Sequence, residues 1–161
     1  MPTLSPTAQR VQQALIDLGS AAPIHEHAEA CRTSAEAAVV LGCSVAQIAK
    51  SVIFKGASSG QSILVIASGA NRVDTEKIAA IAGETPGKAN PDFVREHTGF
   101  VIGGVSPIAH LKPGKVIFDQ DLLQHDFVFP AGGTPQAMFR IAPDELLRIS
   151  GAVLADVALV A

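Results

Sequence analysis

The feature that most constrains the fold is a short segment at residues 62–67, SILVIA, which is apolar throughout after its first residue. A run of this kind is typical of a strand buried on both faces, because a strand with one wet face alternates apolar and polar residues. Residues 51–55 form a second apolar segment, and the Gly- and Ser-containing residues 56–60 between them have the composition of a hairpin loop. The sequence therefore predicts two paired strands, the second of them covered on both sides.

Short helices and strands are expected on either side of this hairpin. Polar capping residues, Pro at helix starts and Gly at helix ends mark the helices. The predicted helices cover residues 6–18, 33–41, 44–49, 74–82, 90–97 and 143–149, the predicted strands cover 23–27, 116–119, 127–129 and 137–141, and 155–160 fits either. Because these elements do not alternate as regular βαβ units, we expect an α+β fold with a mixed or largely antiparallel central sheet flanked by short helices.

Length and charge limit the class of protein further. The 161 residues show no repeat, low-complexity segment or long linker, so we expect a single domain over residues 1–161. A net charge of −3 and the absence of Trp and Tyr argue against a broad basic or base-stacking surface for nucleic acid. Any contact with nucleic acid is then local or assisted by a partner.

The sequence predicts neither a membrane segment nor secretion. Its most apolar stretch, residues 151–161, is shorter than the about 20 residues of a spanning helix and contains Asp156. Residues 1–6 lack the basic and apolar regions of a signal peptide. We therefore expect a cytoplasmic protein.

Lys50 is a candidate functional residue because it stands where a predicted helical turn meets an apolar strand. A lysine at the end of an element that faces a cleft holds a phosphate or polarises a carbonyl as a fixed point charge. A solvated surface lysine is the ordinary alternative. The hydrophobic setting of Lys50 distinguishes it from Lys55, which lies at the hairpin loop.

Two glycine-containing loops are further candidates. In residues 100–107, FVIGGVSP, the paired glycines permit unusual backbone angles and the close approach of a ligand. Backbone N–H groups in such a turn can converge on an anion or a developing oxyanion. Residues 130–135, PAGGTP, allow the same interpretation, and for both loops an ordinary glycine turn is the alternative. Neither matches the spacing of the common nucleotide-binding loops.

The histidines and cysteines predict no metal site. His25 and His27 would share one face of a strand, yet no third ligand completes the set. Cys31 and Cys43 have no zinc-site spacing and are most simply reduced thiols. Cys31 with His27 as its base would make a thiol hydrolase, although an inert thiol is the favoured interpretation.

Taken together, several segments resemble the YbaK/prolyl-tRNA-synthetase-associated domain family of aminoacyl-tRNA deacylases. The matching segments are residues 33–38 (TSAEAA), 47–51 (QIAKS), 64–69 (LVIASG), 98–107 (TGFVIGGVSP), 131–133 (AGG), 139–141 (FRI) and 144–146 (DEL). The resemblance extends from about Val11 to Val153. It implies a curved mixed sheet, and it implies hydrolysis of the ester between a wrong amino acid and tRNA by a free-standing, trans-editing enzyme.

The resemblance also implies site residues. The family's essential lysine corresponds to Lys50, and its Gly-x-x-x-Pro loop begins at Gly103. The expected catalytic residues are Lys50, Gly103 and Gly104, and the expected substrate-binding residues are His27, Thr33, Ser51, Ser68, Val105, Ser106, Pro107, Ala131, Gly132 and Gly133. No cofactor and no metal are expected. The partners are the acceptor end of a mischarged tRNA and a synthetase.

We hypothesise that Lys50 holds the terminal adenosine phosphate or the ester region while the amides of residues 103–106 orient the carbonyl and stabilise the oxyanion. Water, or a substrate group acting as base, would then attack, because an aminoacyl ester is already activated and needs no protein nucleophile. Misacylated tRNA-Pro or a related small-amino-acid mischarge is the expected substrate. Ala131 replaces a frequent serine of the family, and Thr134 follows where some members carry His or Asp, which leaves the amino acid open. A non-catalytic module that binds tRNA or a synthetase is the alternative.

Overall fold

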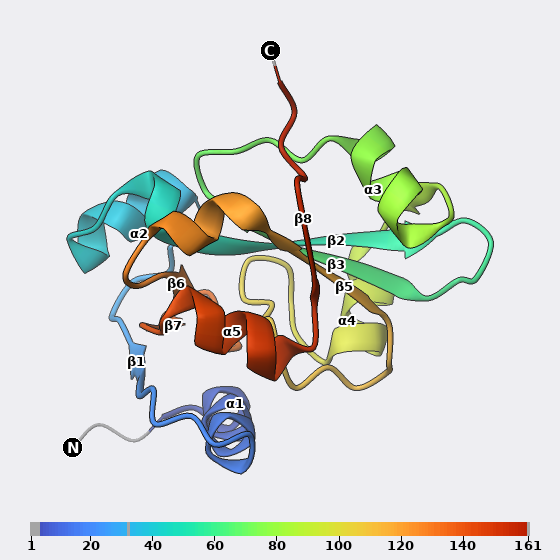
Figure 1. Ribbon diagram of the computed structural model, residues 1–161. Helices are drawn as coiled ribbons and strands as arrows, with labels where there is room; N and C mark the ends of the chain where they lie inside the picture. The colour runs from blue at the N-terminus through green and yellow to red at the C-terminus, as the bar shows by residue number, and fades with distance from the viewer. Residues whose placement is uncertain (1–3, 32, 161) are drawn as a thin grey trace.

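The computed structural model describes residues 4–31 and 33–160 (Figure 1). Residues 1–3, which belong to the N-terminal segment considered above, lie outside the described residues, as do residues 32 and 161. The helices are α1 (Pro6–Asp17), α2 (Ser34–Leu41), α3 (Thr75–Ala82), α4 (Pro91–Thr98) and α5 (Pro143–Ser150), with 3-10 turns η1 (Val45–Gln47) and η2 (Gln120–Gln124). The strands are β1 (Ile24–Glu26), β2 (Ile48–Gly56), β3 (Ser62–Ser68), β4 (Pro86–Lys88), β5 (Lys115–Asp119), β6 (Phe129–Pro130), β7 (Ala137–Phe139) and β8 (Val153–Ala155). None of the helices within these ranges has the length and apolar character needed to cross a bilayer.

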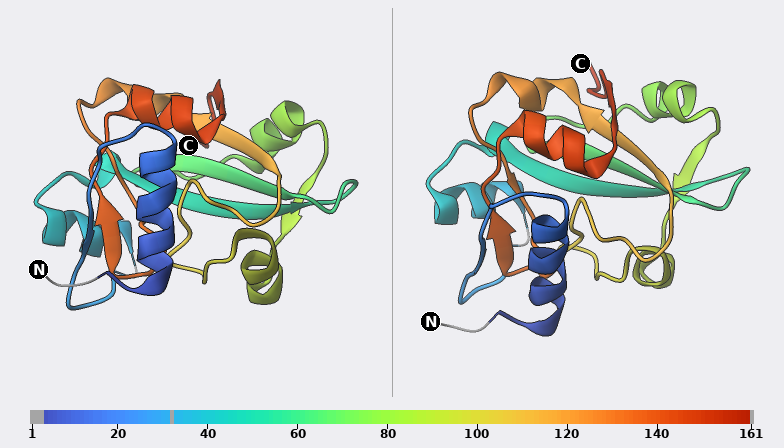
Figure 2. Two further views of the ribbon diagram at one scale, coloured as in Figure 1. Left: turned by 90° about the horizontal axis from the view of Figure 1, so that it is seen from below. Right: turned by 60° about the horizontal axis from the view of Figure 1, so that its bottom comes forward.

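The predicted hairpin is the centre of the sheet. β2 pairs with β3 in antiparallel register, with Lys50 opposite Ala67 and Lys55 opposite Ser62. β5 continues the sheet beyond β3 and β8 lies beyond β5, both in parallel pairing. β4 pairs antiparallel with β2, and β6 pairs parallel with it. The sheet is therefore mixed, its long strands bend along their length (Figure 2), and the predicted α+β class is confirmed.

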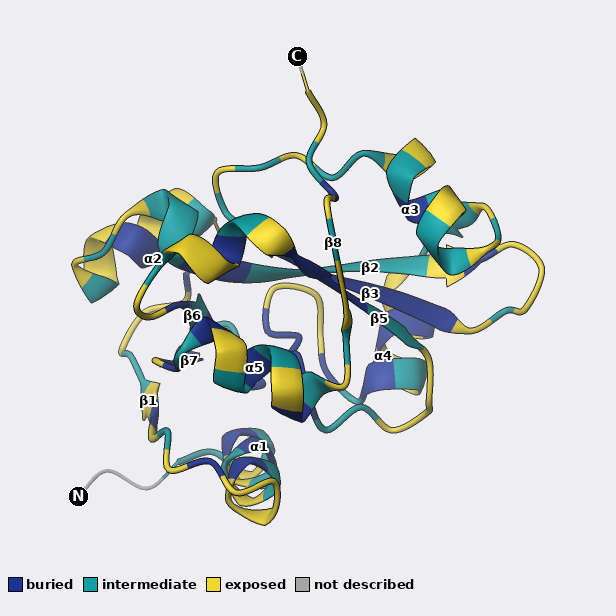
Figure 3. Ribbon diagram, in the orientation of Figure 1, coloured by how far each residue is buried: buried dark blue, intermediate teal, exposed yellow. Residues whose placement is uncertain are grey.

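β3 is buried along its whole length, as its continuous apolar run predicts (Figure 3). Leu64 and Ile66 point into the main core, which α1, α4 and α5 cover. Ile63 and Val65 point to the opposite face, where Ile78 of α3 packs on them. Side chains alternate across a strand, so one apolar segment supplies both cores.

The outer edge of β2 is only partly paired. β6 pairs with residues 48–49 and β4 with residues 54–56, while in the part of the chain that the structure describes no strand is paired with residues 50–53 on this edge. The backbone of a strand edge left open in this way keeps unpaired N–H and C=O groups. This open edge leaves room beside Lys50.

A second, two-stranded sheet lies below the open edge. β1 and β7 pair antiparallel, with His25 opposite Met138. Met138 packs with Ile48 of β2 and Ala37 of α2 in a small apolar cluster. This cluster joins the second sheet to the start of β2.

Several element boundaries differ from those predicted. The helical turn expected over residues 44–49 ends at Gln47, and β2 begins at Ile48, so Lys50 lies within the strand. The reason is pairing, since Ile48 pairs with β6 and Ala49 pairs with both β3 and β6. β4 and η2 were not predicted from the sequence. The segment at 155–160, expected as a strand or a helix, is neither beyond Ala155, where β8 (Val153–Ala155) ends.

Glu84 joins the hairpin loop to β5. Its Oε1 accepts hydrogen bonds from the main-chain N–H groups of Ser58 and Ser59, both at 2.9 Å. Its Oε2 accepts from Lys115 Nζ at 2.5 Å and from the hydroxyl of Ser59 at 2.8 Å. The hydrogen bond from Lys115, followed by those from Ser59, lowers the pKa of Glu84 from its ordinary 4.5 to about 2.

The Glu84→Gln variant should be less stable than the wild type near pH 6, with a difference that shrinks towards pH 3. A carboxylate whose pKa is lower in the folded state contributes stability above its ordinary pKa and loses it as the pH falls towards the folded value, here about 2. Thermal unfolding midpoints of both proteins at pH 6 and pH 3 measure this. Glu29→Gln, an exposed change, is the control. An equal wild-type-to-Glu84→Gln difference at both pH values would contradict the assignment.

Candidate functional site

A cavity of about 290 Å³ lies at the start of β2. Its lining residues come from α2 and the segment before it, from β2, from the 103–105 loop and from the β6–β7 region: Cys31, Thr33, Ser34, Ala37, Ile48, Ala49, Lys50, Ser51, Gly103, Val105, Ala131 and Met138. Ligand pockets usually measure about 300–1,000 Å³, so this cavity lies at the lower end of that range.

The structure brings some of the predicted site residues together and leaves others outside. Lys50, Gly103, Thr33, Ser51, Val105 and Ala131 line the cavity, whereas Gly104, His27, Ser68, Ser106, Pro107, Gly132 and Gly133 do not. Residues as distant in the sequence as Thr33 and Ala131 thus line one cavity.

Lys50 is half-buried at this cavity and already has a hydrogen-bond partner. Its Nζ donates to the main-chain oxygen of Asn71, in the loop after β3, at 2.6 Å. Burial lowers the pKa of the Lys50 ammonium, the negative charge of Asp119 raises it, and the charge of Arg72 lowers it. An ammonium has three donors, so the bond to Asn71 leaves two for a ligand.

Alternation along β2 decides which residues accompany Lys50. Lys50 leaves the strand on the face of Val52, which packs in the cluster beneath α3. Ala49 leaves on the opposite face and packs in the main core with Val105. Ala49, Lys50 and Val105 all line the cavity, so the cavity is bounded by residues from both faces of β2.

The 103–107 loop contributes to the cavity mainly through Gly103. Gly103 has a φ of +94°, which a residue with a Cβ rarely adopts. Gly104 is buried, and its N–H donates to the main-chain oxygen of Val101 at 3.0 Å. A Cβ at Gly104 would lie 2.7 Å from Thr134 Cα, so this glycine permits close contact between the two glycine loops.

The end of the same loop is anchored away from the cavity. The Ser106 hydroxyl accepts a hydrogen bond from the N–H of Ile108 at 3.2 Å, and the Ser106 carbonyl lies 2.6 Å from Nε2 of His110. A carbonyl only accepts, so Nε2 carries the proton. Burial lowers the pKa of His110, which favours this neutral form. Pro107 lines a different cavity.

The second glycine loop turns into the core. Gly132 donates its N–H to the Ala137 carbonyl at 2.6 Å, and a Cβ at Gly133 would lie 2.9 Å from Cγ2 of Val11. Ala131 alone of the predicted residues 131–133 lines the cavity. The loop therefore supports the site through backbone packing.

The remaining predicted residues have separate roles. Thr33 caps α2, its hydroxyl accepting from Glu36 N–H at 3.1 Å, and also lines the cavity. Ser51 lines the cavity with a buried hydroxyl for which the structure gives no hydrogen-bond partner among the described residues. The Ser68 hydroxyl donates to the Ala46 carbonyl at 2.8 Å, a contact within the fold. His27 bonds through its main-chain N–H to Gln136.

The Cys31–His27 alternative finds little support in the geometry. Cys31 lines the cavity, but His27 does not. Burial raises the pKa of the Cys31 thiol, as does the nearby Glu36, which is the opposite of what a thiolate nucleophile requires. Among residues 4–31 and 33–160, no group of three or more His, Cys, Asp or Glu side chains is placed to hold a metal.

The apolar floor of the cavity, formed by Ala37, Ile48 and Met138, was not predicted from the sequence. Ala37, Ile48 and Met138 come from a helix and two strands, and they meet only in the folded chain. Each of the three lay within a predicted helix or strand, and nothing in the sequence joined them. Ser34 also lines the cavity, and the capping pattern that begins at its neighbour Thr33 could have indicated it.

Known proteins match this chain in sequence and structure. A model of the aminoacyl-tRNA editing domain matches residues 28–149. The uncharacterized protein YwhH of Bacillus subtilis (strain 168) is 35% identical over 118 residues, 73% of this chain and 74% of that protein. A crystal structure of a protein proposed as a trans-editing enzyme for prolyl-tRNA synthetase is 43% identical, with a TM-score of 0.92 over 98% of this chain and 100% of the other. The crystal structure of hypothetical protein APE2540 is 31% identical, with a TM-score of 0.86 over 93% and 99%. Because the editing-domain match spans most of the sequence and the fold agrees throughout, the chain belongs to the aminoacyl-tRNA editing domain family.

Proposed function

We propose that this protein hydrolyses the ester bond of misacylated tRNA in trans, with misacylated tRNA-Pro as the first substrate to test. The observation that carries the proposal is that Lys50 and Gly103 line one small cavity in a chain of the editing-domain family. The similar protein proposed as a trans-editing enzyme for prolyl-tRNA synthetase supports the choice of tRNA. The acceptor end of tRNA and a synthetase are the proposed partners, and the cytoplasm is the proposed compartment.

The proposed mechanism relies on positioning rather than on a protein nucleophile. Lys50 binds the phosphate of the terminal adenosine or the ester region with the donors that Asn71 leaves free. Gly103 exposes backbone beside the bound ester and helps to orient its carbonyl. Gly104 acts indirectly, since its N–H is engaged by Val101 and its lack of a Cβ lets the two loops meet. Water attacks the oriented carbonyl, and the tRNA hydroxyl leaves.

The apolar floor of the cavity supports a small, uncharged amino acid as the group removed. Ala37, Ile48 and Met138 offer no partner for a charged side chain. An isolated charge in such surroundings loses hydration without compensation. A panel of tRNA-Pro charged with alanine, cysteine or proline tests this, and binding of every member without hydrolysis would instead indicate a non-catalytic module.

Lys50→Ala should lower kcat/KM for deacylation of mischarged tRNA by at least about 100-fold, because the change removes a fixed charge at the reacting end. Rates of release of the labelled amino acid measure the effect. Lys55→Ala, five residues along the same strand and exposed, is the matched control and should keep wild-type turnover. Wild-type turnover by Lys50→Ala with a normal circular dichroism spectrum would refute the assignment.

Gly103→Ala and Gly60→Ala form a matched pair. Both glycines have positive φ, +94° and +71°, so each substitution should lower the free energy of unfolding by about 1–2 kcal/mol. Only Gly103 lines the cavity, and only its variant should lose deacylation, by about tenfold. Urea unfolding and deacylation rates separate the two effects. Equal activity in the two variants would show that the Gly103 backbone is not used.

Cys31→Ser should retain deacylation close to the wild-type rate, since the change conserves size while removing the thiol. Removal of a true nucleophile lowers kcat by several orders of magnitude. The same release assay measures it. A collapse of activity in Cys31→Ser alongside an active Lys50→Ala would favour the thiol mechanism.

A further inference from the structure

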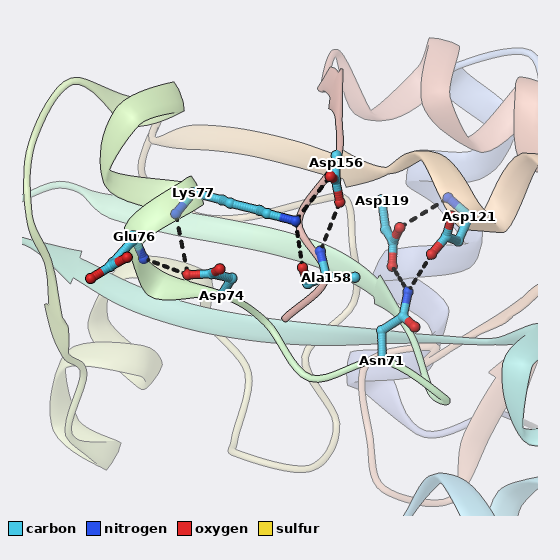
Figure 4. Close-up of polar contacts among 8 residues, drawn as sticks. All are labelled: Asn71, Asp74, Glu76, Lys77, Asp119, Asp121, Asp156 and Ala158. Atoms are coloured by element: carbon cyan, nitrogen blue, oxygen red, sulfur yellow. Dashed lines mark hydrogen bonds and ion pairs between the residues drawn. The ribbon is translucent and has the colours of Figure 1, made fainter. Parts of the chain in front are cut away.

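A buried carboxylate lies at the end of β5, on the far side of Asn71 from Lys50. Asp119 is the last residue of β5 and is fully buried. Its Oδ2 accepts from the Ser68 N–H at 3.0 Å, and its Oδ1 accepts from the Asp121 N–H at 2.9 Å (Figure 4 shows Asp119 and Asp121). Burying a carboxyl group is costly unless it is hydrogen-bonded, and these bonds give each oxygen of Asp119 a partner. They also hold the Asp119 side chain in one place inside the fold.

Asn71 connects this carboxylate to Lys50. Its side-chain Nδ2 donates to Asp119 Oδ2 at 2.9 Å and to Asp121 Oδ2 at 2.8 Å (Figure 4). Its main-chain carbonyl accepts the hydrogen bond from Lys50 Nζ at 2.6 Å. One residue thus holds the two carboxylates with its side chain and the ammonium with its backbone.

The side-chain bonds of Asn71 add to the main-chain bonds of its loop, in which Gly69 donates to Ile48 and Arg72 accepts from Leu159. The loop begins at Gly69 and Ala70, of which Ala70 is exposed, and it turns from β3 towards α3. Its main chain is bonded through the Asn71 N–H to the Ser68 carbonyl at 2.9 Å. The side-chain bonds to Asp119 and Asp121 fix the orientation of the Asn71 peptide. A lysine side chain has many rotamers, so a fixed acceptor is needed to hold its ammonium in one place.

We propose that Asp119 is a positioning residue for Lys50, which it holds in place through Asn71. The proposal rests on the proposed function for its effect on deacylation, but the placement of Lys50 is testable without substrate. Two charged groups affect the pKa of the Lys50 ammonium: Asp119 from the end of β5 raises it, and Arg72 from the loop after β3 lowers it. Asp119 is not expected to touch the reacting atoms.

The first experiment measures the pKa of Lys50 by NMR of the lysine side chains, with its signal assigned by its loss in Lys50→Arg. The negative charge of Asp119 raises the pKa of Lys50, so the neutral variant Asp119→Asn should show a lower pKa for Lys50 than the wild type. Asp156→Asn is the matched control, because that carboxylate pairs with Lys77 at 2.9 Å and should leave Lys50 unchanged. An unchanged pKa of Lys50 in Asp119→Asn, or an equal change in the control, would overturn the proposal.

The second experiment uses Asn71→Ala, which keeps the main-chain carbonyl but removes its link to Asp119. We expect kcat/KM for deacylation to fall about tenfold at temperatures where the variant is folded, because a small displacement of a positioning charge is enough to slow the reaction. The thermal midpoint should also fall, because the variant loses the hydrogen bonds from Asn71 to Asp119 and Asp121. This variant also tests the positioning of Lys50 through Asn71 if Asp119→Asn does not fold. Wild-type kcat/KM in Asn71→Ala beside an inactive Lys50→Ala would refute positioning and leave the function intact. Full activity in Lys50→Ala would instead refute the function, and the NMR result would still decide the placement of Lys50.

Discussion

The pairing of β2 with β3 is the constraint on which the rest of the structure depends. β3 is buried on both faces, so it requires a layer of apolar side chains on each side, and α3 on one face with α1, α4 and α5 on the other provide them. β2, its partner, is shared on the outer edge between β6 and β4, which leave residues 50–53 open. On the β3 side of the hairpin the sheet continues into β5, whereas on the β2 side it is interrupted at residues 50–53. The candidate site lies at this interruption.

The charges of Asp119 and Arg72, which affect the pKa of Lys50, lie outside the lining of the cavity. Partial burial of Lys50 disfavours its charge, and the buried carboxylate of Asp119 on β5, beyond β3 in the sheet, opposes that effect. The distance between them is spanned by a polar residue, Asn71, with hydrogen bonds of 2.6 and 2.9 Å on its two sides. A half-buried ammonium that keeps free donors is suited to binding a phosphate or a carbonyl.

The glycines of the two loops illustrate how a motif carries structural as well as chemical meaning. Gly103 lies at the cavity, where its positive φ shapes the exposed turn. Gly104 and Gly133 instead allow the backbone to approach neighbouring segments more closely than a side chain would permit. A glycine pair in the sequence is consistent with either use, because both need the same missing Cβ.

Local sequence patterns were enough to predict the hairpin, the capped helices, the α+β class and Lys50 as a candidate functional residue. These follow from local rules, namely apolar runs, capping residues and the glycines that end helices, and from resemblance to a known family. Only the tertiary structure decided which candidates share a cavity: it joined Thr33 and Ala131 to Lys50, excluded Ser68 and Gly132, and supplied Met138. It also decided that Asp119 and Asn71 accompany Lys50. Such contacts join strands that are distant in the chain, and no local period encodes which strand lies beside which or where an edge stays open.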